Sequence, residues 1–491
     1  MRRYLVFFGL VALVCANFYH ANGQTFTGTN LLDYQHGQIP GDTINQSGIY
    51  NRTVAQFSMN NIRAGVSLEQ YHTPLADRNY LKLTQFSLRY QSDQLEVSLG
   101  HFAETLGRGL LLRSFEIPGA VLEDLSYRSR HYFHRDILGF MGHYRVNKHF
   151  SIKALYGQPL NYLFPPNQDD ALRRPDIIEA INPEVSIGRQ LFGGALLRVT
   201  NSSEISVYGM LNASGSLLPS MSYYIEMAKS ADTYALSNFS RDVPFALYGS
   251  LNVALGSLGV SLEYKKYNNF LLGAGFNEPP ALVKEHSYRV LNRSTHVLQP
   301  INETGYQVEA FYSFPDFSML TFNHTIAIND FGKQFVFQEY FLEYDFRLAG
   351  DHHTRVFLDY AEDPFKLEAR RISSGAYVEW KISPSGLLNT YYEYQTFSRL
   401  ESQVYNHVAV LGLTLHPKLA VNLTGEISND PFLTEKEFRT WLGGNLRYQL
   451  NNRNTIQLFG GQRRGGPACN AGICYEVLDF TGVEFRLVSR F

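Results

Sequence analysis

The sequence predicts an all-β fold, a single transmembrane antiparallel β-barrel of about 22 strands. Three observations predict this class. Apolar and polar residues alternate in segments along the whole chain, short turns alternate with long connections, and aromatic residues abound without any apolar stretch long enough for a membrane helix. The 491 residues include 35 Phe and 32 Tyr, whereas only 18% are charged. Strands that face lipid on one side and a wet lumen on the other have this composition.

The N-terminus is predicted to be a cleaved signal peptide. Two arginines precede an apolar core, and an Ala-Asn-Gly stretch ending at Gly23 offers small residues to a signal peptidase. We expect residues 1–23 to direct Sec export and residues 24–491 to form one barrel in the outer membrane of a Gram-negative cell, with no room for a separate plug domain. A lipoprotein signal at Cys15 is the alternative, although the residue before it is a bulky valine.

Short and long connections alternate along the chain. This sorting indicates short periplasmic turns, long extracellular loops and both termini in the periplasm, so the strand count is even, with about 20 strands if one hairpin is miscounted. A secreted sandwich or propeller is the alternative, but its loops need not sort by length. The predicted long loops lie at 104–135, 158–187, 214–242 and 268–302. The predicted turns, rich in Gly, Pro, Asn, Asp and Ser, lie at 60–61, 92–94, 146–149, 201–204, 256–259, 314–317, 349–353, 383–386, 416–418 and 451–454.

The polar faces of the alternating segments carry candidate lumen residues. In "EYFLEYDFRL", Glu339, Glu343 and Arg347 lie opposite apolar and aromatic neighbours. In "FRTWLGGNLRYQL", Arg439 and Arg447 lie on the polar side in the same way. Charges of both signs argue against a channel that selects one sign of ion. These side chains either line a solute path or pair across neighbouring strands and stiffen the wall.

One segment is expected to fold inward and narrow the lumen. "GHFAETLGRGLLLRSFE" runs from the end of a strand into Gly107, Arg108 and Gly109, then through an apolar patch to Arg113. The glycines permit a turn or a close approach of the backbone, and an arginine is long enough to reach into the lumen. The alternative is that the glycines only end a strand.

The last residues, "TGVEFRLVSRF", alternate as a final strand would. Phe485, Leu487 and Phe491 lie on the apolar face of this stretch. A final strand at the periplasmic rim can close against the first strand and remove both edges of the sheet. The three residues resemble the terminal signal that the barrel-insertion machinery reads, so we expect that machinery to be a partner.

Cys469 and Cys474 are the only cysteines after the predicted signal. An exported protein meets an oxidising compartment, which favours a disulfide that pins one loop. Two free thiols are the alternative, and two cysteines are too few for a structural zinc site with four cysteine ligands. No metal and no cofactor is expected.

Two stretches resemble a known family. "GHFAETLGRGLLLRSFE" and "RRGGPACNAGICYEVLDFTGVEFRLVSRF" are similar to motifs in a Bacteroidota family of porin-like outer-membrane β-barrels of unknown function. The resemblance implies the location and the fold, and it supplies no catalytic residue.

Together these patterns predict a porin-like channel for small or oligomeric solutes. The alternative is a barrel plugged by its own loops that acts as a scaffold or accessory subunit of an outer-membrane secretion or assembly complex. We expect no enzyme, since "HRD" at 134–136 lacks the other kinase motifs and no Ser/His set stands out. Besides membrane lipid, a surface glycan or a protein is a candidate partner for the loop at 159–170, which could equally cover the mouth. A net charge of −2 argues against nucleic acid.

Overall fold

The computed structural model leaves the predicted signal at 1–23, and most of the predicted binding loop at 159–170, outside the described residues. The residues that it describes are 24–38, 44–123, 130–160, 176–201, 204–230, 243–273, 276–297, 301–349, 351–415, 418–435, 437–470 and 473–491.

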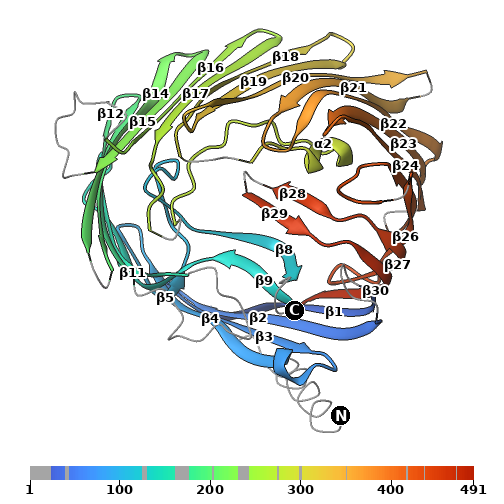
Figure 1. The fold of residues 1–491 in the computed structure, drawn as a ribbon. Coiled ribbons are helices and arrows are strands. Elements are labelled where there is room, and N and C mark those ends of the chain that lie inside the picture. Colours follow the sequence, from blue (N-terminus) through green and yellow to red (C-terminus); the bar gives the residue numbers. More distant parts are fainter. Residues whose placement is uncertain are drawn as a thin grey trace.

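Within these described residues, twenty-four antiparallel strands close into one barrel, seen along its axis in Figure 1. The last strand pairs with the first, so the sheet has no free edge. The predicted class, an all-β closed antiparallel barrel, is confirmed. The barrel strands are β1 (Gln24–Gln38), β2 (Gln46–Met59), β3 (Ile62–His72), β4 (Tyr80–Gln91), β5 (Leu95–Phe102), β10 (Ile137–Arg145), β11 (Phe150–Pro159), β12 (Ile177–Ile187), β13 (Gln190–Thr200), β14 (Ile205–Leu218), β15 (Met221–Ser230), β16 (Phe245–Leu255), β17 (Leu258–Asn268), β18 (Glu303–Ser313), β19 (Met319–Asp330), β20 (Gln334–Leu348), β21 (His352–Asp363), β22 (Glu368–Ser383), β23 (Gly386–Arg399), β24 (Ser402–Leu415), β25 (Leu419–Ser428), β26 (Arg439–Gln449), β27 (Asn454–Arg463) and β30 (Phe480–Arg490).

The predicted count of about 22 strands is too low, because β12 and β15 lie within stretches that were expected to be long loops. Strand β12 contains Pro183, which has no N–H to donate to a ladder. Its pairing with β13 has a gap there, and the Asn182 side chain donates to Gly194 O at 2.7 Å instead. Strand β15 lacks a clean alternation because its inner face is partly apolar, as at the buried Ala228.

The two ends of the barrel differ. One end, here the turn rim, carries the turns from β2 to β3 and from β4 to β5 and the C-terminus; the other is the loop rim. Because β12 is an additional strand, the chain reaches the loop rim after β13. The predicted turn at 201–204, which joins β13 to β14, therefore lies at the loop rim, and its prediction as a turn on the opposite side is wrong. The other short turns lie at the turn rim as predicted. The loop rim also carries short connections, such as 364–367, so length alone does not separate the rims.

The two faces of the wall differ in chemistry. Large apolar side chains such as Leu358, Leu411 and Leu442 are exposed on the outside, whereas charged ones such as Arg371 and Glu393 are buried on the inside. The alternation of the strands produces this difference, because successive side chains point to opposite faces. The lumen, not a conventional core, therefore holds the buried charges.

The helical segments are short. Among the residues that the structure describes, they are the 3-10 turn η1 (Ala76–Arg78) and the helix α2 (Arg289–Arg293). Within the described part of the chain, no helix has the length and apolar character needed to cross a membrane.

Candidate functional site: the lumen

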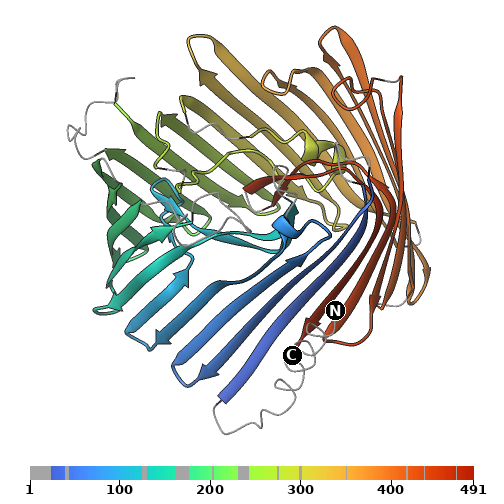
Figure 2. The ribbon, with the colours of Figure 1, turned by 60° about the horizontal axis from the view of Figure 1, so that its bottom comes forward.

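Three connections from the loop rim fold into the lumen, where Figures 1 and 2 show them inside the ring of strands. We call the described residues of 103–136, 269–302 and 464–479 the first, second and third inward segments. The first carries β6 (Thr105–Leu106), β7 (Leu112–Arg113), β8 (Phe115–Glu123) and β9 (Arg130–Arg135), the second carries α2, and the third carries β28 (Gly466–Asn470) and β29 (Ile473–Val477).

The apolar patch of the first inward segment packs on the wall rather than facing solvent. Leu110 and Leu111 are fully buried and Leu112 is 1% exposed. They join a cluster with wall residues from β10 to β17 and with Phe270 and Phe276 of the second inward segment. The first and second segments therefore share one apolar core inside the barrel.

The two glycines of this segment wrap the backbone around a carboxylate. Gly107 has φ +59° and Gly109 has φ +95°, conformations that favour glycine. A Cβ on Gly107 would lie 2.4 Å from Glu226 Oε2, and Arg108 N donates to the same oxygen at 2.6 Å. Glu226 is fully buried on β15. Gly107 is thus needed for the close approach between the turn and the wall, whereas a Cβ on Gly109 would meet Glu278 O of the second inward segment at 2.6 Å.

The two arginines of the segment point to different surroundings. The Arg108 guanidinium lies 5.0 Å from the ring centre of Tyr224, and its side chain is exposed. Arg113 is half-buried, and its N–H donates to Phe276 O at 3.1 Å. Both lie within the lumen, and their role in narrowing a solute path stays a prediction.

The hairpin of β8 and β9 sits on a different arc of the wall, formed by β1 to β4. Its anchor is Glu69, which is 1% exposed and accepts hydrogen bonds from Tyr50, Thr84 and the Tyr132 N–H at 2.9, 2.9 and 3.1 Å. The Arg52 guanidinium lies 3.5 Å from the ring centre of Tyr132. One buried carboxylate therefore joins two wall strands to β9.

Helix α2 is held by two carboxylates of the wall. Arg289 N and Val290 N donate to Glu393 at 3.0 and 2.8 Å. Arg293 donates to both oxygens of Glu426, at 2.6 and 3.1 Å, in the bidentate geometry that guanidinium groups favour. Both carboxylates are buried, so these hydrogen bonds replace water that the site excludes.

Three predicted lumen residues hold inward segments. Glu339, buried, lies 2.9 Å from Arg371, whose Nη1 donates to Ser294 O of the second segment at 3.0 Å. Glu343 accepts a hydrogen bond from Tyr288 at 2.5 Å. Arg439 pairs at 2.8 Å with a carboxylate of the third segment.

The other two predicted lumen residues lie elsewhere. Arg347 pairs with Asp351 at the turn rim, and Arg447 is exposed on β26. Neither contacts an inward segment in the described part of the chain.

A histidine secures the end of the second inward segment. The His296 Nδ1 atom lies 3.2 Å from Asp363, its ring stacks on Phe337 with centres 4.4 Å apart, and its Nε2 atom lies 3.9 Å from Glu303. Burial alone lowers the pKa of His296, but its contacts with the two carboxylates outweigh burial and raise the pKa above its usual value.

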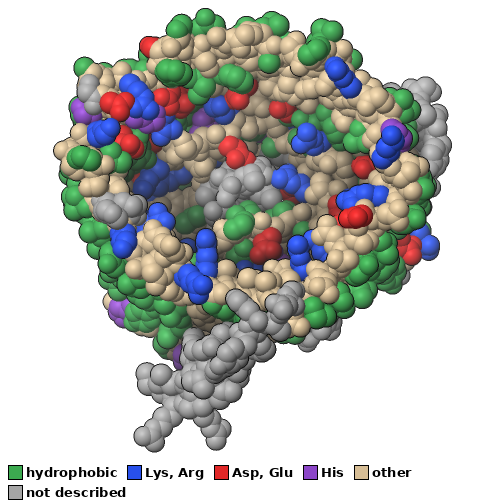
Figure 3. All heavy atoms as spheres, turned by 180° about the vertical axis from the view of Figure 1, so that it is seen from behind, with side chains coloured by type: hydrophobic (Ala, Val, Ile, Leu, Met, Phe, Trp, Pro, Cys, Tyr) green, Lys and Arg blue, Asp and Glu red, His purple; other side chains and the backbone are tan. Residues whose placement is uncertain are grey.

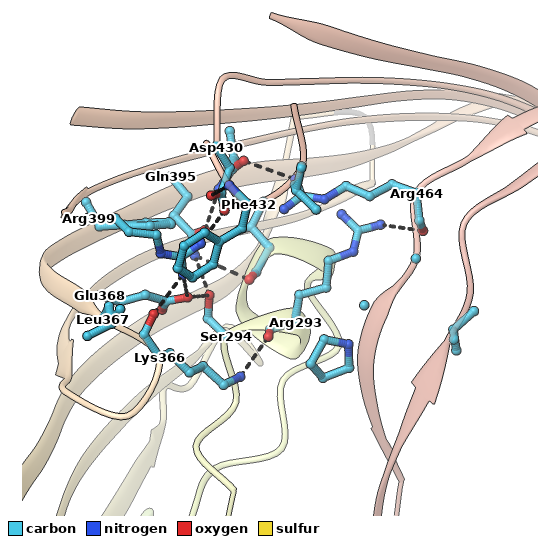
Figure 4. A pocket seen from close by; sticks show the side chains of 18 of the residues that line it. Arg293, Ser294, Lys366, Leu367, Glu368, Gln395, Arg399, Asp430, Phe432 and Arg464 are labelled. Atoms are coloured by element: carbon cyan, nitrogen blue, oxygen red, sulfur yellow. Dashed lines mark hydrogen bonds and ion pairs between the residues drawn. The ribbon is translucent and has the colours of Figure 1, made fainter. Parts of the chain in front are cut away.

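A cavity of about 500 Å³ remains at the loop rim, between α2, the third inward segment, the strands β22 to β24 and the loop-rim connections that follow β21 and β25 (Figure 4). We call it the rim chamber. Charged side chains of both signs line it: Arg293, Lys366, Glu368, Arg399, Asp430 and Arg464. Among the described residues, no group of three or more His, Cys, Asp or Glu is placed to hold a metal ion.

The predicted C-terminal signal lies at the seam. Phe491 stacks on Phe26 with ring centres 5.9 Å apart. Phe485 and Leu487 lie on β30, where they pair with residues of β1 on one side and of β27 on the other.

The two cysteines lie opposite each other in the ladder of β28 and β29. The side chains of Cys469 and Cys474 lie outside the described part, so their disulfide stays a prediction.

Sequence reasoning missed the buried charges that hold the inward segments, Glu226, Arg371, Glu393 and Glu426. Each lies on the polar face of an alternating strand, which is the only signal that the sequence offers for it. Their partners lie far away in the chain, as with Val290 and Glu393, 103 residues apart.

Comparisons with solved structures return outer-membrane barrels of low similarity. The chain is similar to Pseudomonas aeruginosa OpdL, with 11% identity, a TM-score of 0.41 and coverage of 70% of this chain and 95% of that one. It is similar to Acinetobacter baumannii OccAB3, with 9% identity, a TM-score of 0.41 and coverage of 76% and 100%. It is also similar to P. aeruginosa OccK2 (OpdF), solved in complex with glucuronate, with 11% identity, a TM-score of 0.34 and coverage of 95% of this chain and 97% of that one.

No curated protein matches the chain. The model of a family of unknown function, DUF6029, matches residues 45–172 and 221–491, and since these ranges make up most of the sequence, the chain belongs to this family.

Proposed function

We propose that this protein is an outer-membrane channel for small solutes, with a lumen narrowed by its three inward segments. The observation that carries the proposal is the closed barrel with an apolar outer face and a charged inner face. A bilayer admits only spanning elements whose backbone polar groups are all paired, and a closed barrel meets this condition. Figure 3 shows a hollowed face with Lys, Arg, Asp and Glu side chains gathered around the lumen, which supports a wet path.

The width of the barrel supports selective passage. Barrels of about 16–18 strands leave an aqueous channel, and those of about 22 strands hold a plug. A ring of 24 strands therefore has room for inward segments beside a path. On this proposal Gly107, Arg108, Gly109 and Arg113 shape the constriction on one arc of the wall.

The remaining parts of the proposal follow from the sequence. Residues 1–23 direct Sec export and are removed, Phe491 is read during insertion, and Cys469 and Cys474 form a disulfide in the third inward segment. The family resemblance favours a bacterium of the Bacteroidota as the source.

The test is the conductance of refolded residues 24–491 in a planar lipid bilayer, beside a variant in which a short Gly-Ser linker replaces 104–123. We expect small steps from the unchanged protein and larger steps from the variant. Arg447→Gln is the control, because this arginine is exposed and remote from the inward segments. Its steps should match those of the unchanged protein.

The outcome that refutes the channel is silence from both proteins when each has refolded, as judged by the mobility shift that heating causes on a gel. A silent unchanged protein with a conducting variant would mean a plugged barrel, and the scaffold reading would replace the channel.

A further inference from the structure

The rim chamber is lined by exposed apolar side chains as well as by charged ones. Phe365, Leu367 and Phe432 line it while remaining 39%, 44% and 59% exposed. Exposed apolar groups that converge on a cavity favour a ligand with an apolar part. The volume of about 500 Å³ falls within the range of small-molecule sites.

The carboxylates of the rim chamber already have cationic partners. Glu368 lies 3.2 Å from Arg399 and 3.1 Å from Arg371. Asp430 pairs with Arg399, and Asp479 lies 2.8 Å from Arg439 of β26. Each of these carboxylates therefore already contacts an arginine, although Arg399 serves two of them, so none lacks a cationic contact that a ligand would have to supply.

Arg464 has no such partner. It extends from the end of β27 into the rim chamber (Figure 4), and its Nη1 donates to the neutral Asn406 Oδ1 at 3.0 Å. Its Nε is buried without a hydrogen-bond acceptor, and no carboxylate of the described residues lies within ion-pair distance. Burial, and next the charge of Arg293, lower the pKa of Arg464 to about 10, although carboxylates beyond ion-pair distance, those of Glu426, Asp430 and Asp479, act in the opposite direction. A partly buried guanidinium beside another cation gains from an added negative charge.

We propose that the rim chamber binds an organic anion, a carboxylate joined to an apolar group, with the carboxylate on Arg464 and the apolar group against Phe432 and Leu367. The claim that such an anion is the transported solute rests on the proposed channel function, whereas the claim that the rim chamber binds it does not. Such a site at the loop rim would collect solute at the mouth before it passes the inward segments.

The protein carries its own reporter for this test. Trp441, 2% exposed, has its ring centre 5.6 Å from the Arg464 guanidinium, and the chain holds only 2 Trp. In a Trp380→Phe background, Trp441 fluorescence reports on the rim chamber alone. The probe is cyclohexanecarboxylate, titrated into refolded protein in detergent at constant ionic strength. Its neutral isostere cyclohexanecarboxamide, acetate and inorganic phosphate are the comparisons.

We expect a saturable change with cyclohexanecarboxylate, and binding at least about tenfold weaker with the other three compounds. Arg464→Gln should weaken binding of cyclohexanecarboxylate by a similar factor, and Arg447→Gln should leave it unchanged. Asn406→Asp keeps Arg464 but gives it an internal carboxylate partner at the Asn406 position, so it should abolish binding without removing the cation.

Equal responses to the acid and its amide would overturn the proposal, as would unchanged binding in Asn406→Asp. Equal binding of phosphate would overturn its apolar part. Because these titrations need no ion current, a protein that binds but fails to conduct refutes the channel alone, and one that conducts but fails to bind refutes the anion site alone.

Discussion

The start of α2 depends on one side chain, so Glu393→Ala tests how the second inward segment is held. Glu393 is fully buried and accepts the Arg289 and Val290 N–H groups at 3.0 and 2.8 Å. Alanine leaves both donors without this acceptor, and each such loss costs about 1–3 kcal/mol. The burial cost of the carboxylate vanishes at the same time, so we expect a net loss of about 3 kcal/mol in the free energy of docking.

A loss of that size makes the detached segment about 100-fold more populated. The assay is trypsin cleavage of protein refolded in detergent, because Arg289 and Arg293 are cleavage sites that docking protects. Cleavage follows the population of the open form when opening is fast, so cleavage at these two sites should accelerate about 100-fold. Cleavage unchanged within about threefold would refute the reasoning that Glu393 anchors the segment.

The matched control is Glu379→Ala. Glu379 lies on the neighbouring strand β22. It accepts a hydrogen bond from the Tyr377 hydroxyl at 3.1 Å and not from an inward segment. Its removal should leave trypsin cleavage in α2 unchanged. A general loosening of the barrel would accelerate cleavage in both variants, and this result too would contradict a local anchor.

Three further outcomes are expected. Gly107→Ala should lower the melting temperature more than Gly119→Ala, since both have positive φ but only the first Cβ would meet Glu226, at 2.4 Å; equal losses would contradict a role for this contact. The pKa of His296 is raised by folding, so its stabilising effect is complete below about pH 6.5 and is lost as pH rises through the folded value. Trypsin cleavage in α2, relative to that of His296→Phe, should therefore increase with pH, and a constant ratio would refute this linkage. Deleting Phe491 should slow insertion by purified barrel-insertion machinery into vesicles, as followed by the gel mobility shift, whereas an unchanged rate would show that the aromatic is not read.

The barrel class follows from the sequence because alternation is a local property. Each strand displays its two faces within about ten residues, and no knowledge of its neighbours is needed. The predicted number of strands is too low because the alternation of apolar and polar residues is interrupted in two strands, in each case for a reason that depends on what lies beside the strand. Strand β12 carries Pro183, whose place in the ladder is covered by the Asn182 side chain, and β15 faces an apolar inward segment rather than water.

The site was predictable only in part, for a related reason. The glycines of the first inward segment predict a tight turn or a close approach of the backbone, and the structure places them inside the lumen. The wall partner of Gly107 and Arg108, Glu226, lies more than 100 residues away in the chain. Nothing in the residues around Glu226 or Glu393 distinguishes an anchor from a hydrated wall residue, because the difference lies in what folds against them.

The seam between β1 and β30 has a consequence for the order of assembly. Arg486 donates two hydrogen bonds to Asp33, at 2.7 and 2.8 Å, across 453 residues of chain. Arg130 of the first inward segment lies 3.7 Å from the same carboxylate. This docking place is complete only after the two ends of the chain have met, which is the slowest kind of contact to form. The Arg130 end of the first inward segment therefore gains its complete docking place only after the ring has closed, whereas Glu69 on β3 offers its anchor without the seam.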